Sequence, residues 1–279
     1  MPIPEPTTAA GAAGLAALLE HPASTVLATD FDGTLSPIVE DPTQARAHPG
    51  AVPALRRLAP HLDSVAVLTG RPAAVAVEYG GFAGVPELGR LVVLGHYGLE
   101  RWQGPDGAVT APDVGPGVAS ARADLPGVLA RAGAPDGTWI EDKGSAVAVH
   151  TRRTPDPDGA LELLRGPVAE LAARYDLALE PGRMVLELRP RGMDKGQALA
   201  AFVHERGART VMFSGDDLGD LAAFAAVDAL REEGLAGLKV CSGSAEVTEL
   251  ARRADIVVDG PAGVVALFDA LADALSRLD

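Results

Sequence analysis

Short, uncharged runs rich in β-branched residues alternate with longer stretches rich in alanine and leucine along much of the chain. Runs of this kind at 24–29, 64–68 and 210–214 are typical of strands buried on both faces of a sheet. Further elements are expected as follows: strands at 91–94, 238–241 and 256–258, and helices at 53–62, at 195–205 and from 220 onward. This alternation predicts an α/β fold, with a doubly wound, mainly parallel sheet covered by helices on both faces.

The middle of the chain follows a different pattern. After Gly104, a stretch rich in glycine and proline leads to these expected elements: a helix at 118–132, a hairpin of strands at 138–141 and 145–151, a helix at 158–175, and strands at 177–179 and 184–188. We therefore expect an inserted α+β domain formed by residues 104–188, between two halves of a core formed by residues 1–103 and 189–279. Residues 1–20 are expected to be helical or partly disordered, and residues 264–278 to form a helix packed on the core.

The charge of the chain limits its partners. Its 279 residues include 24 basic and 38 acidic ones, and the formal net charge of −14 repels the phosphate backbone of nucleic acids. No apolar run reaches the roughly 18 residues that a membrane-spanning helix needs. The single cysteine, Cys241, excludes an intrachain disulfide and a cysteine-cluster zinc site. We expect a cytoplasmic enzyme with a small-molecule substrate and no nucleic-acid or membrane partner.

Two carboxylates follow the first predicted strand, in the segment Asp30-Phe31-Asp32-Gly33. In open parallel sheets, ligands bind beyond the carboxyl ends of the strands. Such a pair can hold a divalent cation, and one of its members can be the nucleophile of a phosphoryl transfer. A lone Asp-x-Asp pair is more often a turn with capping carboxylates, so the pair by itself does not establish a functional site.

Other polar groups follow two further predicted strands. Thr69-Gly70-Arg71 offers a hydroxyl and backbone N–H groups that suit a phosphate oxygen. Asp216, Asp217 and Asp220 are three carboxylates within five residues, which either meet a cation or occupy the first turn of a helix. Lys195 begins a predicted helix and is one of three lysines among the 24 basic residues, so we weigh a functional role against an exposed surface position.

Taken in order, these four segments resemble the four motifs of the haloacid dehalogenase superfamily of phosphatases. The resemblance implies a haloacid dehalogenase-like, Rossmann-like core with an inserted cap domain, and Mg²⁺ as the cofactor. It implies that Asp30 is the nucleophile and Asp32 the general acid and base, while Thr69 and Lys195 hold the phosphoryl oxygens. The implied metal ligands are Asp30, Asp32, Asp216 and Asp217, with Asp220 supporting them.

Segments in and around the insert are similar to those of one phosphatase family. Gly95-His96-Tyr97-Gly98-Leu99-Glu100, Glu141-Asp142-Lys143, His150-Thr151-Arg152 and the segment 182–190 resemble trehalose-6-phosphate phosphatases. This resemblance implies the following substrate-binding residues: Gly70, Arg71, His96, Glu141, Lys143, His150, Arg152, Arg183 and Glu187. The two-residue period of a strand predicts that His150 and Arg152 share one face.

The resemblance implies hydrolysis of trehalose 6-phosphate to trehalose and phosphate, dependent on Mg²⁺ and passing through an aspartyl-phosphate. It also implies a functional link to a trehalose-6-phosphate synthase, and we favour a monomer. The alternatives are a phosphatase for another sugar phosphate, such as sucrose 6-phosphate or mannosyl phosphoglycerate, a phosphomutase, and a regulatory module without activity. The fourth motif departs from the family pattern at Gly219, Leu221 and Ala222, which leaves the support of its carboxylates open.

Overall fold

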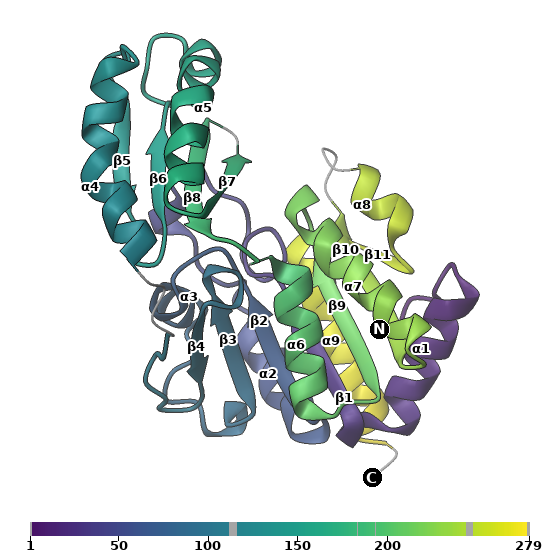
Figure 1. Cartoon of the computed structure of the whole chain (residues 1–279). Helices are drawn as coiled ribbons and strands as arrows, with labels where there is room; N and C mark the ends of the chain where they lie inside the picture. The colour runs from purple at the N-terminus through teal and green to yellow at the C-terminus, as the bar shows by residue number, and fades with distance from the viewer. Residues whose placement is uncertain (1, 112–115, 183, 193, 244–247, 278–279) are drawn as a thin grey trace. The chain divides into compact units, whose positions relative to one another are not determined.

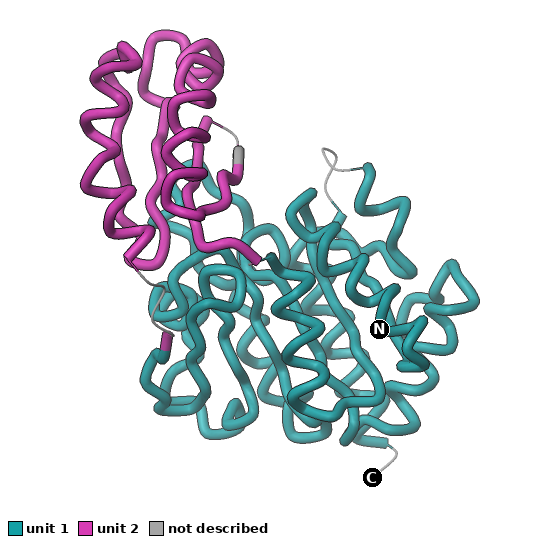
Figure 2. Tube along the Cα trace, viewed as in Figure 1, with its two compact units in different colours: residues 1–110, 194–279 teal, residues 111–193 magenta. Residues whose placement is uncertain are grey.

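The computed structural model describes residues 2–111, 116–182, 184–192, 194–243 and 248–277. The chain divides into two compact units, which Figure 2 distinguishes by colour: unit 1 contains residues 1–110 and 194–279, and unit 2 contains residues 111–193. Relative to the predicted boundaries, residues 104–110 group with unit 1 and residues 189–193 with unit 2. Backbone pairing explains the first difference, because Arg101 and Thr110 exchange two hydrogen bonds of 2.8 Å.

Unit 1 contains a seven-stranded sheet in the order β11-β10-β9-β1-β2-β3-β4. The strands are β1 (Thr25–Thr29), β2 (Ser64–Leu68), β3 (Leu91–Gly95), β4 (Glu100–Gln103), β9 (Thr210–Gly215), β10 (Ala236–Gly243) and β11 (Ile256–Asp259). All neighbouring strands are parallel except the edge pair of β3 and β4. The predicted α/β fold with a mainly parallel sheet is confirmed.

Helices cover both faces of this sheet (Figure 1). They are α1 (Ala9–Glu20), α2 (Ala51–Leu58), α3 (Ala73–Gly80), α6 (Lys195–Arg206), α7 (Leu221–Glu232), α8 (Thr248–Arg253) and α9 (Gly260–Leu275). Successive strand residues point to opposite faces, so Leu27 packs in the core beneath α1, α2, α3 and α9, while Val26 and Ala28 pack beneath α6, α7 and α8. This double burial is why the strands contain so few polar residues.

Unit 2 is a four-stranded antiparallel sheet with two helices on one face. The strands are β5 (Trp139–Asp142), β6 (Val147–His150), β7 (Leu177–Gly182) and β8 (Val185–Pro190), in the order β5-β6-β8-β7, and the helices are α4 (Pro116–Arg131) and α5 (Pro157–Arg174). Apolar side chains from both helices pack against Val147, Val149, Leu186 and Leu188. The alternate residues of these strands form the opposite face, which the helices of unit 2 do not cover.

Among the described α-helices and strands, three were not predicted from the sequence. The α3 sequence contains two valines, which favour strands, and β4 is a charged edge strand whose order depends on pairing with β3. The third, α8, has only six residues, too few for a clear periodic pattern. Among the described residues, no helix combines the length and the apolar character needed to cross a membrane.

Close packing of α1 on β10 gives a prediction about stability. A Cβ added at Gly14 would lie 1.9 Å from the backbone carbonyl oxygen of Gly237. We expect Gly14→Ala to lower the free energy of unfolding by about 1–3 kcal/mol, the usual cost of overpacking a core. Urea denaturation followed by circular dichroism measures this change.

The matched control is Gly127→Ala in α4. Gly127 is exposed, and the nearest atom to an added Cβ is the end of the flexible Arg131 side chain at 3.3 Å. Because alanine favours helices more than glycine does, this variant should be as stable as the parent or more so. Equal destabilisation by the two substitutions would contradict the packing explanation.

Candidate active site

Three buried carboxylates meet at the carboxyl end of the central strands of unit 1. Asp30 directly follows β1, Asp216 directly follows β9, and Asp220 ends the short 3₁₀ helix Leu218–Asp220 before α7. One oxygen from each carboxylate lies within 4.8 Å of the others. The strands themselves bring the first two together, because β1 and β9 pair in parallel and the Asp30 N–H donates to the Ser214 carbonyl at 2.8 Å.

Lys195 places a buried positive charge among these carboxylates. It is the first residue of α6, whose N-terminus is capped by Asp194 through a 2.8 Å bond from the Gln197 N–H. Its Nζ lies 2.7 Å from Oδ1 of Asp30 and 2.7 Å from Oδ1 of Asp220, and only 6% of the residue is exposed. The alternative of a surface lysine is therefore wrong.

Asp220 supports the cluster through both of its oxygens. While Oδ1 accepts from Lys195, Oδ2 accepts from the backbone N–H groups of Asp216 at 2.9 Å and Asp217 at 3.2 Å. Asp217 and Asp220 form a capping box at the 3₁₀ helix, in which each side chain accepts from the other's backbone. These side chains hold the turn in the segment where Gly219 replaces the polar residue of the family pattern.

The electrostatics of the cluster favour a cation. Burial is the main cause that raises the pKa of Asp30 well above its ordinary value; Lys195 opposes this rise, and Asp220 and Asp216 add to it. Burial, with the charges of Asp220 and Asp217, raises the pKa of Asp216 to about 7. Burial also acts to lower the pKa of Lys195, but Asp220 and Asp30 outweigh it and this pKa lies well above its ordinary value.

The donor set fits Mg²⁺. Carboxylate oxygens are ligands that this hard cation takes, and the negative charge of three carboxylates exceeds the single charge of Lys195. Thr34 Oγ1 donates to Oδ1 of Asp216 at 3.3 Å, which orients that carboxylate. Asp217 is exposed and is not one of the three clustered carboxylates, so the structure gathers Asp30, Asp216 and Asp220 from the predicted set.

Asp32 is paired with Arg71. The guanidinium contacts the half-buried carboxylate through two bonds, Nε to Oδ2 and Nη2 to Oδ1, both of 2.7 Å. A third N–H of Arg71 donates to the Pro42 carbonyl at 3.0 Å. The Arg71 side chain thus joins Asp32 to the loop that follows it. No contact of this kind was predicted for Arg71, which was expected to bind substrate.

Thr69 and Gly70 begin the turn that follows β2. Thr69 is buried, its Oγ1 accepts from the Arg71 N–H at 3.1 Å, and Gly70 lies against the Tyr97 side chain. The segment after β3 supports this turn, because the His96 N–H donates to Arg71 and the Tyr97 N–H to Thr69, at 2.9 and 3.0 Å.

His96 lies behind that turn. It is only 2% exposed, and its Nε2 is 3.7 Å from Oε1 of Glu100. The other oxygen of Glu100 accepts from the Ala73 N–H at the start of α3, at 2.7 Å. Within unit 1, this predicted substrate-binding residue therefore contacts structural neighbours of the turn.

The remaining predicted residues belong to unit 2, and four of them gather on its polar sheet face or at its edge. Glu141, His150 and Glu187 alternate along β5, β6 and β8 with the apolar residues that face the helices. His150 Nε2 lies 2.7 Å from Oε2 of Glu141, and Lys143 Nζ lies 2.5 Å from Oε2 of the buried Glu187. We refer to this surface, with Trp139, Glu180 and Arg189, as the polar face of unit 2.

Trp139, Glu180 and Arg189 were not predicted from the sequence. Arg189 in β8 donates from Nη2 to Oε2 of Glu180 in β7 at 2.6 Å. Glu180 is the register partner of Glu187. Residues two apart in a strand lie on the same face of the sheet, so Arg189 shares a face with Glu187 and Trp139 with Glu141. This two-residue period could have identified Arg189 and Trp139.

The other two predicted residues of unit 2 are Arg152 and Arg183. The prediction that His150 and Arg152 share a strand face is wrong, because β6 ends at His150 and Arg152 lies exposed in the turn beyond it. Arg183 lies outside the described residues.

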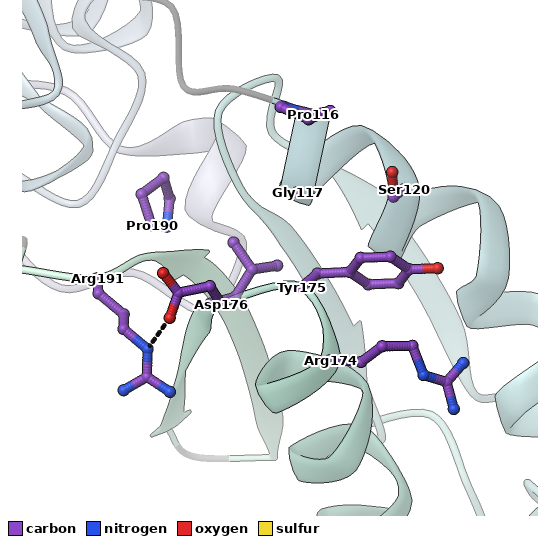
Figure 3. Close-up of a pocket in the computed structure, with 9 residues that line it drawn as sticks. Pro116, Gly117, Ser120, Arg174, Tyr175, Asp176, Pro190 and Arg191 are labelled. Carbon is purple, nitrogen blue, oxygen red and sulfur yellow. Dashed lines mark ion pairs between the residues drawn. The ribbon is translucent and has the colours of Figure 1, made fainter.

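Unit 2 also contains an open pocket of about 500 Å³ near the points where the chain enters and leaves it. Its lining includes Ser120, Arg174, Tyr175, Asp176 and Arg191, and none of the predicted site residues is among the residues described there. Figure 3 shows the ion pair across it, between Nε of Arg191 and Oδ1 of Asp176 at 2.9 Å. This pocket is separate from the polar face.

Comparisons with known proteins agree with this arrangement. A model of the trehalose-phosphatase family matches residues 28–256. The trehalose-phosphate phosphatase of Mycolicibacterium paratuberculosis is 36% identical over 288 aligned positions, which cover 96% of this chain and 66% of that protein. The chain thus spans just under two thirds of the length of this relative.

Solved structures show the same fold. The C-terminal domain of Candida albicans trehalose-6-phosphate phosphatase matches with a TM-score of 0.73 and 20% identity, over 97% of this chain and 99% of that one. A haloacid dehalogenase-like hydrolase from Bacteroides thetaiotaomicron matches with a TM-score of 0.57 and 16% identity, over 91% of this chain and 99% of that one. The chain has the haloacid dehalogenase-like fold and belongs to the trehalose-phosphatase family.

Proposed function

We propose that this chain is a Mg²⁺-dependent phosphatase that hydrolyses trehalose 6-phosphate to trehalose and phosphate through an aspartyl-phosphate. The observation that carries the proposal is the buried cluster of Asp30, Asp216 and Asp220 around Lys195 in a member of this family. A regulatory module without activity has no need to keep a buried nucleophile candidate, a buried ammonium and cation-binding carboxylates together at one strand end.

In the first chemical step, a carboxylate oxygen of Asp30 attacks the phosphorus and the bond from phosphorus to the sugar oxygen breaks. Asp32 gives its proton to the departing oxygen, so trehalose leaves as a neutral alcohol. In the second step, Asp32 takes a proton from water, which attacks the aspartyl-phosphate and releases inorganic phosphate with Asp30 restored. Both Asp32 oxygens accept from Arg71 in this structure, so at least one of these contacts opens when Asp32 carries the proton of the first step.

The other residues position the phosphoryl group and offset negative charge. Lys195 and Thr69 bind the phosphoryl oxygens, and Lys195 also keeps Asp30 in place. Asp30 and Asp216 would hold Mg²⁺, with Asp220 fixing the loop beneath them. When bound, the cation offsets the repulsion between the carboxylates and the phosphate dianion.

The polar face of unit 2 supplies candidates for sugar recognition. Glu141, Lys143, His150 and Glu187 provide charged donors and acceptors of the kind that bind hydroxyl groups. Assays with sucrose 6-phosphate and mannosyl phosphoglycerate test the alternative substrates, and release of free phosphate separates a phosphatase from a phosphomutase.

Removal of the nucleophile is the first test. Asp30→Asn should lower kcat for phosphate release from trehalose 6-phosphate by at least about 10³-fold, because the amide is a poor nucleophile. The control is Asp259→Asn, an exposed aspartate at the end of β11 that lies apart from the cluster and should leave kcat unchanged. Residual activity of Asp30→Asn above one tenth of the parent would rule out Asp30 as the nucleophile.

The effect of substitutions on Mg²⁺ affinity distinguishes the clustered carboxylate Asp216 from its exposed neighbour Asp217. We expect a chelator to stop phosphate release and added Mg²⁺ to restore it. Asp216→Asn should weaken Mg²⁺ affinity at least about tenfold, since a charged ligand is lost, whereas Asp217→Asn should change it little because Asp217 is exposed. Isothermal titration calorimetry measures both, and a larger loss with Asp217→Asn would reverse this assignment.

Substrate selectivity tests the polar face. Glu141→Gln and Lys143→Met should each lower kcat/KM for trehalose 6-phosphate about 10- to 100-fold, the usual effect of losing a charged hydrogen bond. Activity on p-nitrophenyl phosphate, which lacks the sugar, should change far less. Glu162→Gln on α5, where Glu162 pairs with Arg165 on the surface, is the matched control. Equal losses of kcat/KM on both substrates would show that Glu141 and Lys143 do not recognise the sugar.

A further inference from the structure

A stack of three side chains holds one residue of the polar face. Trp139 and His150 are register partners in β5 and β6, and their rings lie parallel, with centroids 4.4 Å apart and an interplanar angle of 7°. The Arg153 guanidinium carbon lies 4.5 Å from the Trp139 ring centroid. Trp139 therefore contacts an imidazole and a guanidinium of its own unit.

The backbone fixes the position of Arg153. Thr151 and Thr154 close a tight turn, in which the Thr154 N–H and Oγ1 both donate to the Thr151 carbonyl, at 2.9 and 2.8 Å. Gly137, two residues before Trp139, has a φ of +92°, and a Cβ there would lie 2.2 Å from the Arg153 carbonyl oxygen. Only glycine fits this approach, so close backbone packing joins the segment before Trp139 to the turn that carries Arg153.

These contacts restrict the His150 imidazole in two directions. The Trp139 ring supports one face of the imidazole, and Glu141 engages its Nε2 at 2.7 Å. A ligand hydroxyl would then meet the Nδ1 side of a ring that can neither flip nor swing without breaking one of these contacts. Hydrogen bonds depend steeply on direction, so such restriction favours one arrangement of hydroxyl groups over another.

We propose that Trp139 and Arg153 are positioning residues that set the sugar specificity of the polar face by holding His150. The proposal rests on the proposed function for the substrate itself, but the stack is a property of the free protein. Trp139 acts through His150 and not as a platform for the sugar ring, because two side chains of unit 2 already pack on its indole.

The first experiment examines the free protein and needs no substrate. The ring current of Trp139 should move the His150 ring protons upfield in the proton NMR spectrum, and loss of the signal in His150→Asn assigns it among the six histidines. Trp139→Leu should return this signal downfield, while Trp139→Phe should keep most of the shift. An unshifted His150 signal in the parent protein would overturn the stack.

The second experiment measures phosphate release in a double-mutant cycle. Trp139→Leu should raise KM for trehalose 6-phosphate about tenfold with kcat and p-nitrophenyl phosphate hydrolysis little changed; Trp139→Phe should restore most of the affinity, and Arg153→Met should fall between them. In the His150→Asn background, Trp139→Leu should have no further effect, because its target is gone. Additive losses would mean that Trp139 contacts the sugar itself and would overturn the proposal.

Two controls keep the outcomes separate. Tyr175→Phe changes an aromatic residue of unit 2 that lies in the open pocket away from the polar face, and it should alter neither KM nor the His150 signal. Equal loss of activity by Trp139→Leu on both substrates would indicate damage to the fold and would overturn the specificity role. If the parent protein releases no phosphate from trehalose 6-phosphate, the proposed function fails, and the NMR result still decides whether the stack exists.

Discussion

The site in unit 1 depends on one buried ammonium that bridges two carboxylates. Lys195 contacts Asp30 and Asp220 at the same distance, 2.7 Å, and three carboxylate oxygens lie within 4.8 Å of one another around it. Carboxylates held so close in a buried place repel each other strongly, and the ammonium opposes the rise in the pKa of Asp30 that burial and the neighbouring carboxylates cause. The same contacts join the end of β1, the turn after β9 and the start of α6.

The alternation of side-chain direction along a strand has different consequences in the two units. In unit 1 both faces of the inner strands are covered, and the polar groups of the candidate site lie just beyond the strand ends, where Asp30, Thr69 and Asp216 follow three adjacent strands. In unit 2 the helices cover one sheet face, and every second residue can be polar along the whole length of a strand. The first arrangement concentrates charge at a point suited to a phosphoryl group, whereas the second spreads donors and acceptors over an area suited to a sugar.

Much of the core could be predicted because its signals are local. A buried strand followed by a carboxylate is visible in a few residues, and this pattern predicts Asp30 and Asp216 at the same edge of the sheet, where β1 and β9 pair in parallel. The partners of Asp32 and His150 were not predictable, because the Arg71 and Trp139 contacts depend on loop paths and on strand register. The error at Arg152 has the same origin: the two-residue period holds only within the strand, and β6 ends at His150, two residues before Arg152.

The order of the units along the chain has an evolutionary consequence. All of the clustered carboxylates and Lys195 lie outside residues 111–193, while the stack of Arg153, Trp139 and His150 lies wholly within them. Each unit has its own apolar core, so changes on the polar face leave the packing around Asp30 undisturbed. Under the proposed function, descendants of such a chain could exchange one sugar phosphate for another by altering a single contiguous segment, while the residues proposed for bond breaking stay unchanged.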